Sequence, residues 1–160
     1  MNAPSMLAQL DDADADWLAA AGERRPIPVG SLLIEQGKPL AAVFIVLDGR
    51  FDIYGAASTI GIGPGEMLGE VSFVDQSPPA ADLVASEDSL VLAVPRAALQ
   101  ARLSTDAAFA SRFYRAVALL LSHRLRRTAA EASGDPRLMP AQADDDARAR
   151  ARRLVERLRG

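Results

Sequence analysis

The sequence predicts a mainly β fold, an antiparallel barrel or jelly roll with flanking α-helices. Between residues 26 and 95, short runs rich in β-branched residues alternate with turn signals such as QGKP, DGR, GPGE and SPP. Strands of this length and spacing are typical of antiparallel barrels and jelly rolls. The segments before and after this region carry helical patterns instead, which predict one helix before the roll and two after it.

The helix before the roll is expected at residues 10–21, LDDADADWLAAA. Asp11 or Asp12 can cap its first turn, and the acids that follow suit the positive end of the helix dipole. Gly22 is the expected stop, because glycine commonly follows the last helical turn.

The expected strands lie in the segments SLLIE, AVFIVLDG, RFDIYG, STIGIG and DSLVLAVP. Within them, VFIVLDGRFDIYG predicts a hairpin that turns at Asp48-Gly49. An Asp-Gly pair between two alternating apolar runs is the strongest short-range signal for such a turn.

Two helices are expected after the roll. Pro95 suits the first position of the helix PRAALQARLS, because its ring fixes φ near the helical value. A longer helix then covers about residues 105–132, with Thr105 or Ser104 as its cap and Gly134 as its stop.

Apolar residues form two stripes along the long helix. The stripes are Phe109, Phe113, Val117 and Leu120, and Tyr114, Val117, Leu121 and Leu125. One stripe suffices to dock the helix on the roll, so the second predicts a partner, most simply a second copy of the chain in a homodimer. The alternative is a helix buried broadly within one chain.

The chain is expected to divide into a domain at residues 1–132 and a tail at residues 133–160. The linker SGDPRLMPAQADD is rich in Pro, Gly and Asp, which predicts mobility. In the stretch DDDARARARRLVERLRG, acids precede arginines, which suits the dipole of a short helix with a small apolar face. We expect a solvated charged helix there. The alternative is that the six arginines from Arg148 to Arg159, together with Arg124, Arg126 and Arg127, contact nucleic acid, anionic lipid or an acidic partner.

Composition excludes several classes of protein. The net charge of −3 argues against general affinity for nucleic acid, and no apolar run approaches the length that crosses a bilayer. The start of the chain lacks the pattern of a secretory signal, and cysteine is absent, so disulfides and thiolate chemistry are excluded. These features favour the cytoplasm. The stretch after residue 132 is too short for a winged helix, so no DNA-binding domain is expected.

No catalytic apparatus or metal site is expected. His123 is the single histidine, and we expect it to be solvated or to face a partner. The chain has no Ser-His-Asp order, P-loop or dinucleotide fingerprint, and its acidic runs lack the pattern of a calcium loop. The sequence therefore predicts a protein that is not an enzyme.

The predicted ligand site lies in the segment LGEVSFVDQSPPAADLV, residues 68–84. A short helix that begins between Gly69 and Ser72 points backbone N–H groups toward an anion. Glycine at position 69 lets the backbone approach a ligand closely. Glu70 places a carboxylate beside that glycine, in a segment otherwise poor in charge.

Over roughly residues 10–130, the order of these motifs resembles the cyclic nucleotide-binding domain. The resemblance is carried by the glycine-bounded segment at residues 30–37, the Asp48-Gly49 turn and GPGEMLGE at residues 63–70. The phosphate-binding cassette of the family follows, here GEVSFVDQSPPAA. The resemblance implies an eight-stranded roll and a cyclic nucleotide as the class of ligand.

The resemblance also implies roles for the residues of the cassette. Glu70 would accept a hydrogen bond from a ribose hydroxyl, and Val71 and Ser72 would line the phosphate. The apolar wall for sugar and base would come from Ile62, Met67 and Leu68.

The cassette departs from the family pattern at Pro79. Ligand-binding members carry an arginine at this position, where it pairs with the cyclic phosphate; here Pro79 is followed by Ala80 and Ala81. A charge-assisted contact to phosphate contributes about 1.5–3 kcal/mol, and a helix N-terminus returns only about 0.3–2 kcal/mol. We expect a loss of at least ~2–4 kcal/mol, which is ~30- to 1,000-fold in affinity for cAMP.

Three interpretations of Pro79 stay open. Another cation, Lys38, Arg50 or Arg96, can reach the phosphate in place of the arginine. Alternatively, Pro78-Pro79 stiffens the loop that fills a vacant cleft. The third interpretation is a different ligand, an uncharged or larger nucleotide. For Glu70, the alternative to ribose binding is capping a helix or accepting from an amide in an empty pocket.

The sequence thus predicts a stand-alone, bacterial-type regulatory or adaptor module with no cofactor and with weak or absent binding of cAMP. It would form a homodimer through residues 105–132 and could contact another protein. One rival hypothesis is a true sensor of cAMP, cGMP or a cyclic dinucleotide that uses a different cation. A second rival is a binder of nucleic acid or anionic membrane through its basic tail.

Overall fold

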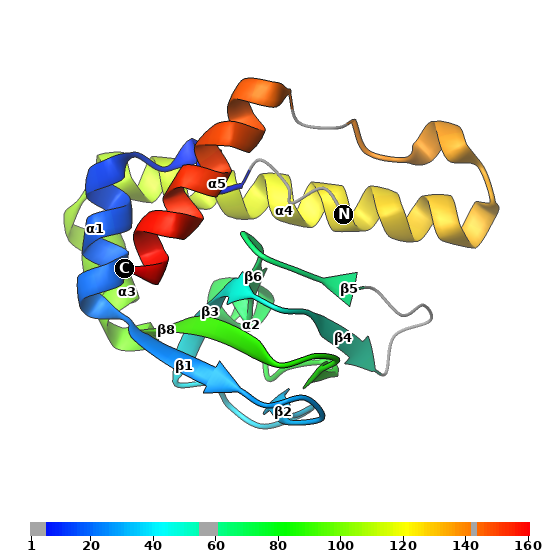
Figure 1. Ribbon diagram of the computed structural model, residues 1–160, viewed down its shortest axis with the longest axis horizontal. Coiled ribbons are helices and arrows are strands. Elements are labelled where there is room, and N and C mark those ends of the chain that lie inside the picture. Colours follow the sequence, from blue (N-terminus) through cyan, green and yellow to red (C-terminus); the bar gives the residue numbers. More distant parts are fainter. Residues whose placement is uncertain (1–5, 55–60, 142–143) are drawn as a thin grey trace.

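Eight strands form the centre of the computed structural model, which describes residues 6–54, 61–141 and 144–160. The strands are β1 (Glu23–Ile27), β2 (Leu32–Ile34), β3 (Ala42–Asp48), β4 (Phe51–Tyr54), β5 (Gly61–Ile62), β6 (Met67–Leu68), β7 (Asp82–Ala85) and β8 (Ser89–Pro95). They form two antiparallel sheets with the orders β1-β8-β3-β6 and β2-β7-β4-β5 (Figure 1). The predicted mainly β roll is confirmed.

Helices flank the roll on the side that Figure 1 shows at the top and left: η1 (Leu7–Gln9), α1 (Asp12–Ala21), α3 (Arg96–Thr105), α4 (Ala107–Ser133), η2 (Pro136–Leu138) and α5 (Asp145–Arg159). The short helix α2 (Glu70–Asp75) follows β6 and lies among the strands of the roll instead. The long helix α4 runs across one side of both sheets, and α1 and α5 pack together at one of its ends. The predicted helices before and after the roll are therefore present.

The first helix, α1, begins with a capping box. The Asp11 carboxylate accepts from the Asp14 backbone N at 2.8 Å, and the Asp14 carboxylate accepts from the Asp11 backbone N at 3.0 Å. Asp14 is buried, and the Nε of Arg112 on α4 donates to its Oδ2 at 2.6 Å. Burial opposes ionisation of Asp14, but the hydrogen bonds from Arg112 and Asp11 outweigh it and lower the pKa of this carboxyl.

The turn at Asp48-Gly49 does not form the predicted hairpin. The chain does turn there, with Gly49 at φ +90°. However, β3 pairs with β8 and β6 whereas β4 pairs with β7 and β5, so the turn carries the chain from one sheet to the other. Glycine is required because a Cβ at position 49 would lie 2.6 Å from the Cα of Ser89.

In the predicted strand segment STIGIG, Gly61 and Ile62 form β5. The first three residues of the segment lie outside the described residues.

The long helix begins two residues later than predicted. Its cap is Asp106, whose carboxylate accepts from the backbone N of Phe109 at 2.9 Å. The expected caps, Ser104 and Thr105, lie in the last turn of α3, and their hydroxyls donate to carbonyls one turn earlier. Gly134 ends α4 in the left-handed conformation, as predicted, at φ +67°.

The core has one part inside the roll and another between the roll and the helices. The part inside the roll includes Phe51, Ile62, Leu68, Val46 and Val91. In the other part, the first predicted stripe of α4 is buried: Phe109, Phe113, Val117 and Leu120. In the second stripe, Tyr114 is 48% exposed and Leu125 is 71% exposed. Docking of α4 through its first stripe is confirmed, whereas the partner predicted for the second stripe stays a prediction; within that stripe, Val117 is buried and Leu121 packs against the core.

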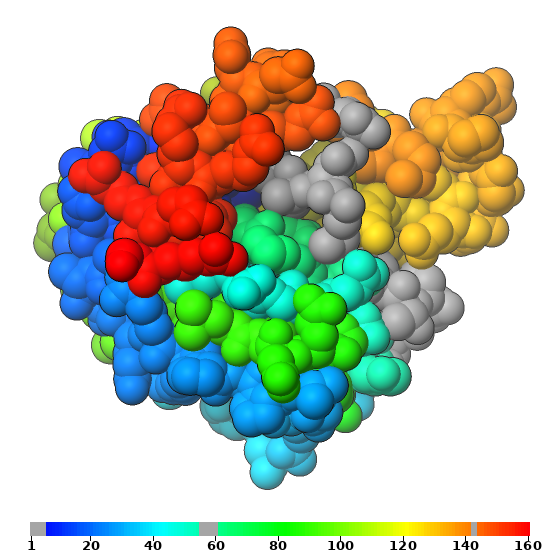
Figure 2. All heavy atoms as spheres, viewed as in Figure 1, coloured from blue at the N-terminus to red at the C-terminus, as the bar shows by residue number. Residues whose placement is uncertain are grey.

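Helix α5 is not the solvated helix that the sequence predicts. Its apolar side is buried against α1, η1 and the end of β3: Ala151, Leu154, Val155 and Leu158. Arg24 donates to the carbonyl of Leu158 at 2.8 Å, and Arg157 donates to the Asp16 carboxylate at 2.9 Å. Figure 2 shows α5, in red, against the blue N-terminal segment. The acids of α1 neutralise arginines of α5 that would otherwise favour solvent. The division of the chain into two parts at residue 132 stays a prediction.

Candidate functional site

A cleft of about 320 Å³ opens between α2, the loop before β7 and α4. Its lining comprises Ile34, Leu40, Ile53, Ile62, Leu68, Gly69, Glu70, Val71, Ser72, Asp75, Ser77, Pro78, Pro79, Ala80, Ala81, Leu83, Leu121 and Arg124. All seven predicted site residues, Gly69 to Ser72 and Pro79 to Ala81, are brought together here. Of the predicted apolar wall, Ile62 and Leu68 line the cleft, whereas Met67 is buried behind it. Their role in binding stays a prediction.

The short helix α2 is positioned by Gly69 and Phe73. Gly69 caps the helix at φ +84°, where a Cβ would lie 3.0 Å from Leu40 Cδ1, so both conformation and space favour glycine. The Phe73 ring is buried and packs edge-on against the Phe113 ring of α4, with centroids 6.1 Å apart. This contact orients α2 so that Glu70 and Ser72 lie at the cleft.

Glu70 forms an ion pair with Arg124 of α4. Nη1 of Arg124 donates to Glu70 Oε1, and Nη2 donates to the backbone carbonyl of Met67 at 2.7 Å. The side chains are 4% and 13% exposed, so the pair is shielded from water. Burial raises the pKa of the Glu70 carboxyl above its ordinary value, and the Arg124 guanidinium acts in the opposite direction.

A second buried carboxylate, Glu66, lies on the far side of Arg124. Its Oε2 accepts from the Gly63 backbone N at 2.8 Å, and its Oε1 lies 3.9 Å from Arg124 Nη2. Within the described residues, Glu66 Oε1 and Arg124 Nε have no hydrogen-bond partner. Burial raises the pKa of Glu66 as well. Two carboxylates therefore share one guanidinium.

None of the three cations considered for the phosphate lines the cleft. Lys38 pairs with Glu35 at 2.9 Å on the surface, and the Nε of Arg50 lies 3.9 Å from the Asp52 carboxylate. Arg96 donates to Gln76 Oε1 at 2.6 Å and lies over the Phe73 ring, at the other end of α2. Each of the three cations is thus engaged by another partner outside the lining of the cleft.

Arg124 is the cation of the cleft that sequence reasoning missed, because the sequence places it only among the basic residues near the C-terminus. In the part of the chain that the structure describes, it is the one lysine or arginine that lines the cleft. A signal for it exists in the sequence. The buried stripe of α4 runs through Phe113, Val117 and Leu120, and Arg124 continues it at helical spacing. A charged residue on a buried stripe requires a partner, and here the partner is Glu70.

The loop opposite α2 is held by backbone contacts. The Pro79 carbonyl accepts from the Gly37 N at 2.9 Å, and the Asp82 carboxylate accepts from the Gln36 N at 2.7 Å. These contacts tie the loop before β7 to the turn after β2. Pro79 thereby presents its ring, and no cation, at the position that the resemblance gives to the phosphate-binding arginine.

The other titratable groups of the described residues bear on a metal site and on the single histidine. Those residues include no group of three His, Cys, Asp or Glu side chains that could hold a metal ion. His123 is half-buried on α4, and burial together with the charges of Arg127 and Arg124 lowers its pKa. The cleft can therefore offer apolar contact and hydrogen bonds, with Arg124 as its cation.

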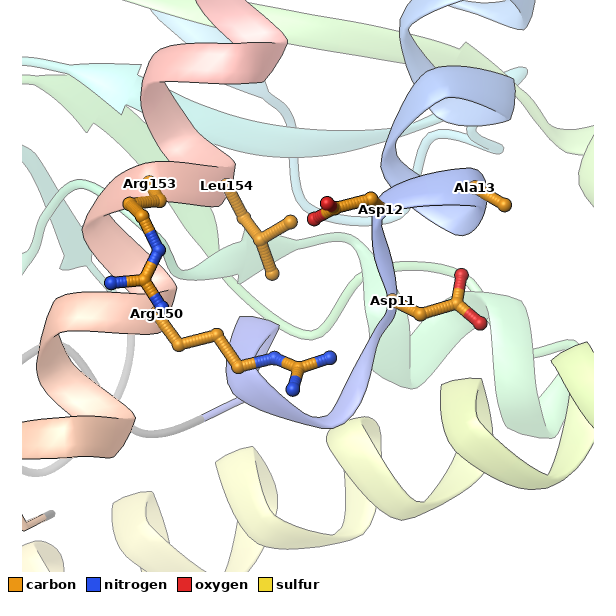
Figure 3. A pocket seen from close by; sticks show the side chains of 6 residues that line it. All are labelled: Asp11, Asp12, Ala13, Arg150, Arg153 and Leu154. Carbon is orange, nitrogen blue, oxygen red and sulfur yellow. The ribbon is translucent and has the colours of Figure 1, made fainter.

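A second hollow, of about 460 Å³, lies between α1 and α5 and is lined by Asp11, Asp12, Ala13, Arg150, Arg153 and Leu154 (Figure 3). Arg150 donates across it to the Leu10 carbonyl at 2.8 Å, and Arg157 lies 3.7 Å from the Asp12 carboxylate. Its charges are those that hold α5 on α1.

Comparison with known proteins gives the same fold and the same region. A family model described as the cyclic nucleotide-binding domain matches residues 24–106. The cyclic AMP receptor protein of Thermus thermophilus is 32% identical over 89 residues, which cover 52% of this chain and 41% of that protein. The Pycsar effector protein XpPycTIR of Xanthomonas perforans is 29% identical over 89 residues, which cover 54% of this chain and 29% of that protein. The matches span less than half the length of both curated relatives.

Solved structures extend the likeness to most of the chain. The catabolite activator protein of Thermus thermophilus has a TM-score of 0.63 at 24% identity, covering 96% of this chain and 84% of that chain. The N-terminal domain of a transcriptional regulator from Streptomyces coelicolor A3(2) has a TM-score of 0.60 at 28% identity, covering 82% and 92%. A putative cyclic nucleotide-binding protein from Geobacter metallireducens has a TM-score of 0.67 at 20% identity, covering 76% and 92%.

Proposed function

The chain belongs to the cyclic nucleotide-binding domain family, and we propose that it is a non-catalytic regulatory or adaptor module in which binding of cyclic nucleotides is weak. The observation that carries this proposal is the ion pair between Glu70 and Arg124 opposite a proline at position 79. Arg124, the one cation in the described lining of the cleft, is already paired with Glu70, and the phosphate side of the cleft presents Pro79 where the family resemblance places an arginine.

The energetic argument supports weak binding. A cyclic phosphate that enters the cleft loses water, and desolvation of an anion is costly unless a cation or several donors replace the water. Arg124 can supply that charge only if it leaves Glu70, which would then be buried without its partner. The remaining donors are the hydroxyls of Ser72 and Ser77 and the amides at the start of α2, a helix of six residues whose N-terminus contributes about 0.3–2 kcal/mol.

A second candidate function is a sensor of a cyclic nucleotide that uses Arg124 as its cation. The observation that favours it is the position of Arg124 in the lining of the cleft, beside Glu70. In that case Arg124 would exchange Glu70 for the phosphate, while ribose hydroxyls would donate to Glu70. Replacement of Arg124 by glutamine would then weaken binding, whereas the first proposal predicts no loss.

The partner of the proposed module is a second copy of the chain. Tyr114 and Leu125 leave an exposed apolar stripe on α4, and a helix with such a stripe is suited to pairing about a twofold axis. Among the described residues, no helix has both the length and the apolar character for crossing a membrane. The cytoplasm is the proposed location.

Binding through a basic tail is less well supported. Arg157 and Arg159 are engaged with Asp16 and with the Leu47 carbonyl, and Arg150 with the Leu10 carbonyl. These arginines are therefore less available for the phosphate groups of a nucleic acid or an anionic lipid.

Calorimetric titration with cAMP, cGMP and cyclic di-GMP tests the proposal. We expect dissociation constants above about 100 μM, which correspond to binding free energies less favourable than about −5.5 kcal/mol. Micromolar binding of any of the three would contradict weak binding. Loss of that binding in Arg124→Gln would then establish the sensor instead.

A further inference from the structure

The charges around the cleft are unfavourable for an anion. The charged side chains in its lining are Glu70, Asp75 and Arg124, and Glu66 lies behind Arg124. Arg124 is already shared by Glu70 and Glu66. Asp75 lies at the exposed mouth, where its carboxylate accepts from the Ser77 backbone N. A ligand that carries negative charge therefore meets acids at the mouth and around the only guanidinium that the described lining contains.

The walls of the cleft are suited to an apolar body. They are formed mainly by aliphatic side chains and prolines: Ile34, Leu40, Ile53, Leu83, Leu121 and Pro79. The volume of about 320 Å³ lies at the lower end of the range of about 300–1,000 Å³ that small-molecule sites occupy. The space suits one ring system with one sugar-sized group, and it is small for a cyclic dinucleotide.

The polar groups that remain are acceptors and hydroxyls. A carboxylate has about four lone-pair sites, so Glu70 keeps acceptor capacity beside its bond to Arg124. Ser72 is 5% exposed and lines the cleft, and Ser77 lies across from it. These groups pair with hydroxyl or amine donors of a ligand without requiring it to be charged.

We propose that the cleft binds an uncharged molecule with an aromatic body and hydroxyl donors, specifically a nucleoside in preference to its cyclic phosphate. This inference rests on the proposed function, because it takes the cassette as the site and weak binding of cyclic nucleotides as its premise. The base lies against the aliphatic walls, the ribose hydroxyls donate to Glu70, and the ring of Pro79 occupies the space that a phosphate and its arginine would need. The order of affinities is the reverse of that in a cleft built for an anion.

The test uses ligand pairs that differ only in the cyclic phosphate. Adenosine, guanosine, cytidine and uridine are each titrated against the protein in parallel with the matching 3′,5′-cyclic monophosphate. We expect at least one nucleoside to bind at least about tenfold more tightly than its cyclic partner, a difference of 1.4 kcal/mol. Amide chemical shifts of Gly69, Ser72 and Ala81 should move on binding, which locates the ligand in the cleft.

A pair of variants at position 79 provides the control. Pro79→Arg restores a cation and should reverse the preference toward the cyclic phosphate, whereas Pro79→Gln introduces a long polar side chain without charge and should keep the nucleoside preferred. If either variant fails to fold, the paired titrations of the unaltered chain still decide. Cyclic phosphates that bind more tightly than nucleosides overturn this inference, and they overturn the proposed function as well if their dissociation constants are micromolar. Failure of all eight ligands to bind overturns this inference alone.

Discussion

The guanidinium of Arg124 and the carboxylate of Glu70 form a buried ion pair that joins α4 to the cassette. One partner lies on the helix that carries the exposed apolar stripe, and the other on the short helix that lines the cleft. Any ligand that donates a hydrogen bond to Glu70 therefore contacts a residue that also holds α4 in place. The position of α4 and the state of the cleft are linked through these two side chains.

Arg124→Gln should destabilise the fold. Removal of one partner from a buried ion pair costs about 3–5 kcal/mol, because the other charge is left buried alone. The raised pKa of Glu70 lets that carboxyl take up a proton, which places the expected cost toward the low end. Urea unfolding followed by circular dichroism measures the change.

The control for this variant is Arg126→Gln, at an exposed position two residues further along α4. It should change stability by less than about 0.5 kcal/mol. In the double variant Arg124→Gln with Glu70→Gln, part of the lost stability should return, since no charge is left unpaired. Equal effects at positions 124 and 126 would show that the ion pair does not stabilise the fold.

Glu66→Gln should raise stability at neutral pH. The pKa of Glu66 is raised by burial, so the folded state binds a proton more tightly than the unfolded chain does. Ionisation of Glu66 therefore costs stability as the pH rises above the ordinary value of about 4.3. Replacement by a neutral isostere removes that cost. The free energy of unfolding is measured for both proteins at pH 4 and at pH 8. The variant should be more stable than the unaltered chain at pH 8, and the two values should lie closer together at pH 4.

Asp14→Asn should reduce the loss of stability in acid. The hydrogen bonds of Arg112 and Asp11 lower the pKa of Asp14 in the folded state. The stability that this carboxylate contributes is therefore fully present above the ordinary pKa of about 3.9 and is lost as the pH falls through the lowered value. The variant should be less stable than the unaltered chain at pH 7, and the difference should narrow below pH 4. A difference that is constant with pH would contradict this assignment.

Leu158→Ala should cost about 2–5 kcal/mol, as is usual for a large-to-small change at a fully buried leucine. Leu158 is buried under α1 and β3, and its carbonyl accepts from Arg24. Arg152→Ala, at an exposed position of the same helix, is the matched control and should be near neutral. If the two variants are equally stable in urea, α5 is a solvated helix as the sequence alone predicts.

Leu125→Asp should convert the proposed dimer to a monomer. Leu125 is 71% exposed on the stripe of α4, so a charge there opposes an apolar interface while disturbing little within one chain. Val29→Asp changes another exposed apolar residue, on a different part of the surface, and should leave the dimer intact. Sedimentation velocity distinguishes the two states. A monomer before any substitution would remove the proposed interface.

The features that the sequence predicts well are those encoded within one contiguous segment. The cap at Asp11 and the start of the short helix at Gly69 each depend on neighbouring residues, and the structure places them as expected. The turn at Asp48-Gly49 was also recognisable, but its pairing was not. β3 pairs with β8, 42–53 residues further along the chain, and β4 pairs with β7, 28–34 residues further along, and a turn signal carries no information about either partner.

The features that the sequence does not predict depend on residues far apart in the chain. Arg157 packs beside Asp16, and Arg124 pairs with Glu70, so the burial of α5 and the cation of the cleft follow from the tertiary arrangement. Arg124 could have been found from its place on the buried stripe of α4. By contrast, the small apolar face of α5 looks the same in sequence whether the helix is solvated or docked.

The most direct test of the central claim, that this cassette lacks an available cation for a phosphate, is calorimetric titration of cAMP into the unaltered chain and into Pro79→Arg under identical conditions. The predicted result is binding weaker than about 100 μM to the unaltered chain and at least about tenfold tighter binding to the variant. Micromolar binding to the unaltered chain that the variant does not strengthen would contradict the claim.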